Sequence, residues 1–402
     1  MDKTLNKQLF SEAKRYIAGG VNSPVRSFKA VGGSPVFIKR GEGSKIYSED
    51  NREFIDYCQS FGALILGHAN PDVVKELKKA IEKGSSFAAP TKLETELAKL
   101  IIKAIPAIER IRLTNSGTEA VMTAIRLSRA YTHKNKIIKF GGSYHGHADY
   151  LLDSKGVPDD FTKYTIVSPY NNIKKAQELA DQQKEDLAAI IVEPVAANAG
   201  VVLPKDGFLR ALRKIADKHN IVLIFDEVIT GFRLVYGGAQ EFFGIKPDLT
   251  CLGKIIGGGL PIGALGGRKE IMGLLAPDGP VYQAGTFSGN PASVTAGLTT
   301  LRTLCASNPY KKLEGLTRGL CEGIKQKAEE YGFKIKINFI GSMFSIATDL
   351  FKGFYQGLLK EGIYLSPSGF EANFLSTAHT AQDVEKTLRA VEKSFKNLKE
   401  GN

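Results

Sequence analysis

Short unbroken runs of apolar residues recur through the middle of the chain, and longer amphipathic segments separate them. Such runs, rich in branched side chains, are typical of strands buried on both faces of a sheet. They predict strands at 111–113, 136–140, 187–192, 221–225 and 248–253. Helical patterns follow several of these runs, for example at 207–219. The alternation predicts an α/β fold whose large domain has a mostly parallel sheet covered by helices.

The patterning changes on both sides of this region. Short paired strands are expected at 36–39 and 45–47, while helices and strands at 313–331, 334–338, 343–348 and 381–398 indicate a smaller α+β domain. We therefore expect an amino-terminal segment, 1–55, that packs with the small domain. Residues 56–305 would form the large domain and residues 306–402 the carboxyl-terminal small domain.

Composition and charge narrow the classes of function. The chain has 402 residues, 43% hydrophobic and 24% charged, as soluble globular proteins do. Its net charge of +12 is dispersed over amphipathic segments, with no Lys/Arg block interleaved with aromatic residues. We expect no nucleic-acid partner, and the positive balance suits anionic substrates.

Cysteine usage and hydropathy bear on location. The four cysteines are far apart and contain no Cys-x-x-Cys unit, which favours free thiols over a disulfide framework or a zinc site. No apolar run reaches the ~18 residues of a membrane span, and the first residues lack a signal-peptide core. We expect a cytoplasmic protein without a membrane partner.

Two groups point to the chemistry. Asp226 leaves a buried strand at the edge where α/β sheets bind ligands, and Lys254 follows the next strand beside a glycine run. A lysine can form an imine with an aldehyde, and a buried carboxylate can keep a heteroaromatic nitrogen protonated. Together they meet the minimum for pyridoxal phosphate (PLP). Taken singly, such a carboxylate is most often a helix cap or ion-pair partner, and such a lysine is most often a solvated side chain.

Three further stretches carry candidate cofactor contacts, and the first two follow predicted strands. The turn 114–119 offers hydroxyls and a helix amino terminus for a phosphate, although Ser116 or Thr118 could equally be a plain helix cap. Tyr144 lies among glycines, where an aromatic ring can cover a planar cofactor. His145 and His147 lack a third ligand with metal-site spacing, so we expect no metal. The loop 282–291 is a second possible phosphate-contacting turn.

These residues resemble a known family. The strings that carry the likeness are Asn-Ser-Pro-Val-Arg at 22–26, Asn-Ser-Gly-Thr-Glu-Ala at 115–120, Ser-Tyr-His-Gly-His at 143–147, Phe-Asp-Glu-Val at 225–228, Gly-Lys-Ile-Ile-Gly-Gly-Gly-Leu-Pro at 253–261 and Gln-Ala-Gly-Thr at 283–286. They are similar to the glutamate-1-semialdehyde 2,1-aminomutases, which are class III, fold-type I PLP-dependent aminotransferases. The likeness runs from about residue 8 to residue 395.

The resemblance implies a role for individual residues. Lys254 would be the Schiff-base lysine and proton carrier, and Asp226 the partner of the pyridine nitrogen. The remaining cofactor-binding set would be Ser116, Gly117, Thr118, Tyr144, Asn198 and Thr286, with Thr286 supplied across a homodimer interface. Substrate binding would fall to Ser23, Arg26 and Glu371.

The implied reaction is conversion of glutamate-1-semialdehyde into 5-aminolevulinate, the tetrapyrrole precursor, while the cofactor cycles between PLP and pyridoxamine phosphate. Two other readings stay open. An ordinary class III aminotransferase would use the same Lys254 and Asp226 with a separate donor and acceptor. A non-catalytic basic protein on the same scaffold would bind RNA or a partner.

The chain departs from the family at two places. Between His147 and Tyr164 it has only residues 148–163 where the family carries a longer mobile lid, and it is also shorter near Asp349 and Leu350. Either the protein is naturally shortened there or its sequence as given lacks residues. A shorter lid predicts easier loss of an intermediate.

Overall fold

The computed structural model describes residues 3–401, so residues 1, 2 and 402 of the predicted domains lie outside it. The chain divides into two compact units. We call Pro71–Asn308 the large unit, and Met1–Asn70 together with Pro309–Asn402 the terminal unit. Each unit is described by itself.

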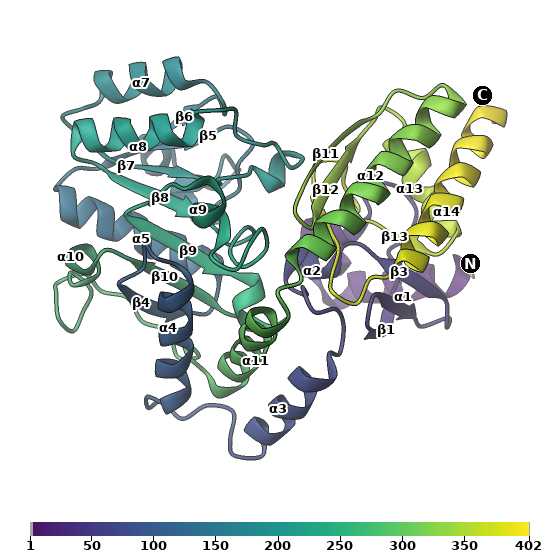
Figure 1. Cartoon of the computed structure of the whole chain (residues 1–402), viewed down its shortest axis with the longest axis horizontal. Helices are drawn as coiled ribbons and strands as arrows, with labels where there is room; N and C mark the ends of the chain where they lie inside the picture. The colour runs from purple at the N-terminus through teal and green to yellow at the C-terminus, as the bar shows by residue number, and fades with distance from the viewer. Residues whose placement is uncertain (1–2, 402) are drawn as a thin grey trace. The chain divides into compact units, whose positions relative to one another are not determined.

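The large unit is built on a seven-stranded sheet with the order β4-β10-β9-β8-β7-β5-β6 (Figure 1). Every strand pair is parallel except those of β10, which runs antiparallel to β4 and β9. This confirms the expected mostly parallel sheet. The strands are β4 (Arg110–Thr114), β5 (Lys136–Phe140), β6 (Thr165–Ser168), β7 (Leu187–Val192), β8 (Val222–Asp226), β9 (Leu249–Gly253) and β10 (Gly263–Gly267).

Helices cover both faces of this sheet. α5 (Gly117–Thr132) and α10 (Lys269–Met272) share one core cluster with Ile191 and Ile224, whereas α7 (Ile173–Gln182) and α8 (Phe208–His219) face the neighbouring Ile190 and Leu223 (Figure 1). Because successive strand side chains point to opposite faces, the unbroken apolar runs serve both layers. The other elements are α3 (Pro71–Ile81), α4 (Lys92–Ala104), η3 (Asp149–Leu151), α6 (Asp159–Thr162), η4 (Ala197–Ala199), α9 (Gly238–Phe243), η5 (Lys254–Gly257) and α11 (Pro291–Ser307).

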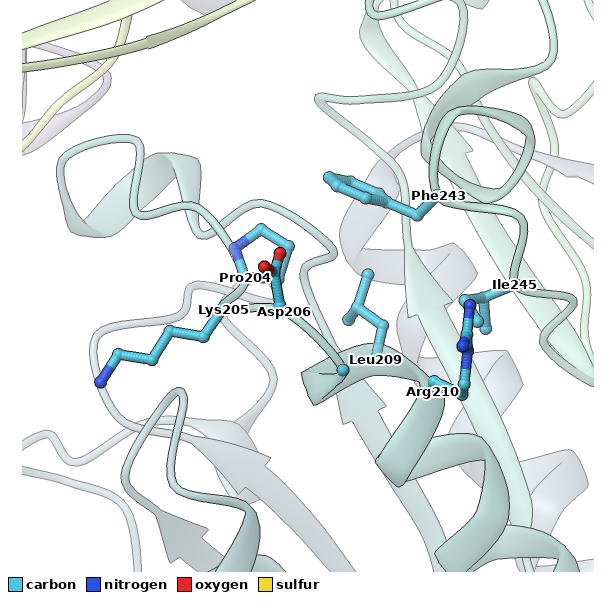
Figure 2. Close-up of a pocket in the computed structure, with 8 residues that line it drawn as sticks. Pro204, Lys205, Asp206, Leu209, Arg210, Phe243 and Ile245 are labelled. Atoms are coloured by element: carbon cyan, nitrogen blue, oxygen red, sulfur yellow. The ribbon is translucent and has the colours of Figure 1, made fainter.

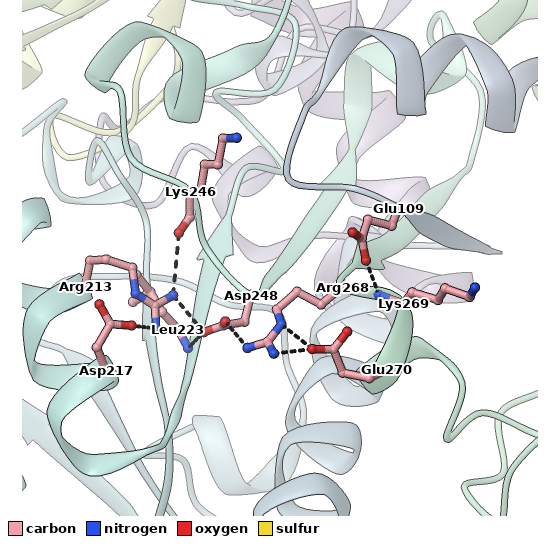
Figure 3. A network of polar contacts seen from close by, with 9 residues as sticks. All are labelled: Glu109, Arg213, Asp217, Leu223, Lys246, Asp248, Arg268, Lys269 and Glu270. Carbon is pink, nitrogen blue, oxygen red and sulfur yellow. Dashed lines mark hydrogen bonds and ion pairs between the residues drawn. The ribbon is translucent and has the colours of Figure 1, made fainter.

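A charged network holds the edge of the sheet where β8 and β9 begin (Figure 3). The buried carboxylate of Asp248 accepts hydrogen bonds from Arg213 Nη1 at 2.7 Å, Arg268 Nη1 at 3.0 Å and the Leu223 backbone N at 2.8 Å. Arg213 comes from α8 and Arg268 directly follows β10. One buried carboxylate therefore ties three neighbouring elements, and its pairing offsets the cost of burying the charge.

The terminal unit contains two smaller sheets, β1-β2-β3-β13 and β11-β12-β14. The hairpin expected from residues 36–47 forms as β1 and β2, which pair antiparallel. β13 adds to β3 in parallel, so segments from both ends of the sequence share one sheet. The strands are β1 (Ile38–Glu42), β2 (Lys45–Ser48), β3 (Glu53–Asp56), β11 (Lys336–Ile340), β12 (Met343–Ala347), β13 (Ile363–Tyr364) and β14 (Asn373–Phe374).

The helices of the terminal unit are α1 (Lys3–Tyr16), η1 (Ala18–Gly20), η2 (Pro24–Ser27), α2 (Gln59–Gly62), α12 (Tyr310–Tyr331), α13 (Phe351–Lys360) and α14 (Ala381–Glu400). The aromatic side chains of Phe354 and Phe395 stack between α13 and α14, with ring centroids 4.9 Å apart. None of the helices within residues 3–401 combines the length and apolar character that crossing a membrane requires.

Candidate active site

The predicted cofactor residues other than Thr286 lie at or after the ends of strands along one edge of the large sheet. Gly263 of β10 pairs with Thr114 on one side and with Gly253 on the other, so β4 and β9 end in the same row. Asp226 pairs with Cys251 of β9, and β7 and β5 continue the row in parallel. Side chains that follow these strands therefore share the edge at which α/β sheets bind ligands.

Asp226 is buried and held in place from two sides. His145 Nδ1 donates to Asp226 Oδ2 at 2.7 Å, and the Val228 backbone N donates to Oδ1 at 3.1 Å. The His145 side chain is also buried, and its Nε2 has no hydrogen-bond partner among residues 3–401. Sequence analysis considered His145 only together with His147, as a possible pair of metal ligands. Its actual partner is the predicted catalytic carboxylate.

Lys254 lies at the end of β9 in a strained conformation. Its φ of +48° is in the left-handed region, which costs free energy for a residue with a side chain and is concentrated at functional sites. A Cβ on the preceding Gly253 would lie 3.2 Å from Val228 Cγ1, and one on Gly117 would lie 2.8 Å from Val228 Cγ2. Val228, which follows β8, therefore packs against the end of β9 and against the first residue of α5.

The turn at the start of α5 combines a helix cap with a candidate anion site. Ser116 is the N-cap, and its side chain accepts a hydrogen bond from the Glu119 backbone N at 3.2 Å. The capping interpretation is therefore correct for Ser116. The first backbone N–H groups of a helix nevertheless lack partners within it and attract anions. A Cβ on Gly146 would overlap Thr118, so the loop that carries Tyr144 and His145 lies directly on this turn.

Glu193 connects two of the predicted cofactor residues. Its Oε1 accepts from the Tyr144 backbone N at 2.8 Å, and its Oε2 accepts from Asn198 Nδ2 at 3.1 Å. The Tyr144 side chain is 50% exposed, as a ring that covers a ligand must be before the ligand binds. Sequence analysis did not select Glu193. The signal that could have found it is the one that selected Asp226, a carboxylate directly after an unbroken apolar strand.

Ionisable side chains are concentrated around Glu193. Burial raises the pKa of Glu193 to about 7, while the nearby charges of His145 and Lys254 act in the opposite direction and Asp226 acts in the same one. Burial likewise raises the pKa of the Cys251 thiol well above its usual value. Perturbed carboxyl groups of this kind are typical of catalytic sites. No group of three or more His, Cys, Asp or Glu side chains within residues 3–401 is placed to hold a metal ion.

Thr286 lies on a separate loop of the large unit, close to the turn that begins α5, because a Cβ on the neighbouring Gly285 would lie 2.8 Å from Asn115 Nδ2. It is exposed and lines a cavity of about 420 Å³ together with residues 86–91. None of the other predicted cofactor residues lines this cavity. The loop that carries Thr286 is anchored to β4 because Arg112 Nη1 donates to Gln283 Oε1 at 3.0 Å.

The predicted substrate residues belong to the terminal unit. Ser23 is the residue before η2, and Arg26 lies within η2 with an exposed side chain. Glu371 is half-buried, and its backbone N donates to the Ser368 carbonyl at 3.2 Å. The predicted site residues are thus divided between the two units.

The segment 148–163, expected to be a short lid, is held against the large unit near its start. Lys139 Nζ donates to the Leu151 carbonyl at 2.5 Å, and Thr165 Oγ1 donates to the Tyr150 carbonyl at 2.7 Å. Residues 153–156 between η3 and α6 are exposed. The short connection therefore begins as a turn packed beside β5 and β6.

A further cavity lies where α8 begins (Figure 2). Its volume is about 350 Å³, and the apolar side chains of Leu209, Phe243 and Ile245 line it together with Lys205 and Arg210. None of these residues belongs to the predicted site.

The donor set at the strand ends fits a PLP-type cofactor. A buried carboxylate suits a heteroaromatic N–H, a lysine amine suits an aldehyde, and the α5 turn suits a phosphate. Ser143 Oγ and His145 Nε2 are buried polar atoms without partners among the described residues, as expected around a polar ligand. Glycines at 117 and 146 leave room where a Cβ would collide with its neighbours.

Fold and site together define a PLP-dependent enzyme of the aminotransferase type. The family Aminotransferase class-III matches residues 28–392. A glutamate-1-semialdehyde 2,1-aminomutase of Thermodesulfovibrio yellowstonii is 52% identical, with 99% of this chain and 100% of the relative covered. The chain therefore belongs to the glutamate-1-semialdehyde 2,1-aminomutase family within the class III aminotransferases, which confirms the resemblance seen in its motifs.

Solved structures of transaminases share this fold. An omega-transaminase from Sphaerobacter thermophilus has a TM-score of 0.91 at 33% identity and covers 97% of each chain. A transaminase with PLP bound has a TM-score of 0.94 at 30% identity, covering 100% of this chain and 99% of its own.

The alignment with the Thermodesulfovibrio relative extends over 427 positions, more than the 402 residues of this chain, so the relative has residues that this chain lacks.

Proposed function

We propose that this chain converts glutamate-1-semialdehyde into 5-aminolevulinate by intramolecular amino transfer, with PLP that cycles through pyridoxamine phosphate. The observation that carries the proposal is the convergence of Lys254, Asp226 and the 116–118 turn at one sheet edge, in a chain 52% identical to an aminomutase over its whole length. The product would serve tetrapyrrole synthesis.

The cofactor would be held by the groups at the strand ends. The Ser116–Thr118 turn would bind the phosphate through backbone N–H groups and hydroxyls, and the Tyr144 ring would cover the cofactor ring. Asp226 would keep the ring nitrogen protonated, with His145 orienting the carboxylate by its 2.7 Å hydrogen bond. When bound, PLP supplies an electron sink for the carbon that loses a proton.

Lys254 would hold the cofactor covalently and carry protons between substrate carbons. Intramolecular amino transfer requires proton removal at one carbon and proton delivery at another, and a single flexible amine can do both. The glycines after Lys254 allow a backbone turn that other residues rarely adopt, since φ is +56° at Gly258 and +99° at Gly259.

Substrate recognition would come from the terminal unit. Arg26 can bind the substrate carboxylate with two parallel N–H groups, and Ser23 can add a hydroxyl. Glu371 would complete this set. An arginine with an exposed side chain suits this task because its planar guanidinium matches the geometry of a carboxylate.

A homodimer would complete the cofactor site. Thr286 is exposed at the cavity with residues 86–91 and would reach the phosphate of the partner subunit. Support comes from large apolar side chains in the same region, since Phe87, Tyr282 and Phe287 are 50%, 73% and 61% exposed. Exposed apolar side chains gathered in one region are typical of protein interfaces. We also propose a cytoplasmic location, supported by four cysteines that are all free thiols.

Turnover without a second substrate tests the function. The purified enzyme should convert glutamate-1-semialdehyde steadily into 5-aminolevulinate with no added amino donor or keto acceptor, and Lys254→Ala should abolish the reaction. A requirement for a separate acceptor would instead identify an ordinary class III aminotransferase. Absence of any cofactor absorption in the purified protein would favour the non-catalytic alternative.

A further inference from the structure

Glu193 is a buried carboxylate to which the proposed reaction assigns no task. It follows β7, whose neighbours in the sheet are β5 and β8, so it lies between the loop that carries Tyr144 and the strand that delivers Asp226. Only 3% of its surface is exposed. A carboxylate buried to this extent destabilises the fold unless its oxygens are hydrogen-bonded.

Its two oxygens hold different loops. Oε1 accepts from the Tyr144 backbone N at 2.8 Å, while Oε2 accepts from the Ala197 backbone N at 3.1 Å and from Asn198 Nδ2 at 3.1 Å. The loop around Tyr144 follows β5, and Ala197 and Asn198 lie in η4 after β7. We propose that Glu193 is a positioning residue that sets the Tyr144 ring and the Asn198 side chain for the cofactor, an inference that rests on the proposed function for the roles of those two residues.

Only a carboxylate of this length satisfies all three donors. An ionised carboxylate has acceptor sites on both oxygens, whereas a glutamine amide presents a donor on one side. In Glu193→Gln, an NH₂ group would face either the Tyr144 backbone N–H or the Ala197 and Asn198 donors. One loop would then lose its anchor and leave a buried donor unsatisfied.

The surroundings of Glu193 act on its charge in both directions. Burial and the charge of Asp226 raise the pKa of Glu193, to about 7, whereas His145, Lys254 and the hydrogen bond from the Tyr144 backbone N lower it. The three donors directed at its two oxygens favour the ionised form, because an ionised carboxylate accepts hydrogen bonds at both oxygens. The contribution of Glu193 is therefore its three hydrogen bonds, and the ionised form is the one that accepts all of them.

The test compares Glu193→Gln with a matched control. Asp248→Asn also removes the charge of a buried carboxylate with three protein donors, but it acts at the edge of the sheet where β8 and β9 begin, away from the cofactor residues. Both holoenzymes are measured for thermal unfolding, for circular dichroism of the visible cofactor band and for the rate of cofactor dissociation on dilution. These spectroscopic readouts do not depend on turnover.

We expect both variants to unfold at lower temperature, but only Glu193→Gln to change the dichroism of the cofactor band and to speed cofactor dissociation, by about 5- to 150-fold as expected for one unsatisfied buried donor. Glu193→Asp keeps the charge but reaches one loop less well, so it should fall between wild type and Glu193→Gln. It is also the variant to use should Glu193→Gln fail to fold.

Wild-type dichroism and dissociation in Glu193→Gln, or in Glu193→Asp if only that variant folds, would overturn the proposal. An equal change in Asp248→Asn would overturn it as well, because the effect would then report general loosening of the unit. A wild-type enzyme that binds cofactor without converting the semialdehyde would refute the proposed function, and the dichroism of the Glu193 variants would still decide the role of Glu193.

Discussion

Replacing Gly263 by alanine tests whether the α5 turn holds the cofactor phosphate. Gly263 begins β10 between Thr114 of β4 and Gly253 of β9. An added Cβ would overlap the Ser116 carbonyl and lie 2.5 Å from Thr114 Oγ1. The first of these is backbone, which cannot rotate away. The Ser116 peptide must therefore move, and with it the N-cap of α5.

The expected magnitude follows from this overlap. Forcing one extra methyl group into a packed site costs about 1–3 kcal/mol. If this free energy is lost from phosphate binding by the turn, affinity for PLP should decrease by about 5- to 150-fold. The φ of Gly263 is not in the left-handed region, so backbone strain adds nothing and the effect is one of crowding alone.

The assay is titration of the cofactor-free enzyme with PLP, followed by visible absorption, alongside thermal unfolding. Gly266→Ala, in the same strand as Gly263, is the control. The nearest atoms to its added Cβ belong to the Ile108 side chain, the closest at 2.6 Å. We expect it to lower stability without weakening PLP binding. Unchanged PLP affinity in Gly263→Ala, or equal weakening in both variants, would refute the phosphate role of the turn.

Three further predictions concern the chemistry. Lys254→Ala should abolish turnover while keeping the fold and noncovalent PLP binding, measured by activity and by cofactor retained on gel filtration; substantial residual activity would contradict its catalytic role. Asp226→Asn should bind PLP but lose about 10²- to 10³-fold in kcat, because a neutral amide cannot stabilise a protonated ring nitrogen; an unchanged rate would make Asp226 a structural cap. The resemblance to the aminomutases implies an intermediate in which the substrate carries two amino groups. With only residues 148–163 as the lid, this diamine should escape and turnover should stall until free diamine is added. Intact mass spectrometry checks the premise: a mass clearly above 43.7 kDa would mean that the chain has residues beyond this sequence, and a matching mass without rescue by diamine would contradict the leak.

Sequence alone predicted the central strands well because their signal is local. β5 and β7 have the expected bounds, β8 lies one residue later than expected at both ends, and β9 begins one residue later than expected. A parallel strand buried on both faces must be apolar throughout, so its residues identify it without knowledge of its neighbours. β10 was not predicted, because Gly-Ala-Leu-Gly-Gly has almost no branched side chain. Its glycines are explained by Ser116, Ile108 and Asp248, which are close only in the folded chain.

The same distinction between local patterns and long-range contacts holds for the site. The sequence by itself determined that Asp226 and Lys254 lie at the ends of buried strands and that residues 116–118 open a helix, since each statement depends on a few adjacent residues. Only the tertiary structure decided that His145 binds Asp226 across 81 residues and that Glu193 binds Tyr144 across 49. Those hydrogen bonds depend on the order in which β5, β7 and β8 lie in the sheet. Strand order arises from long-range packing of both helical layers, so no local pattern along the chain could specify these partners.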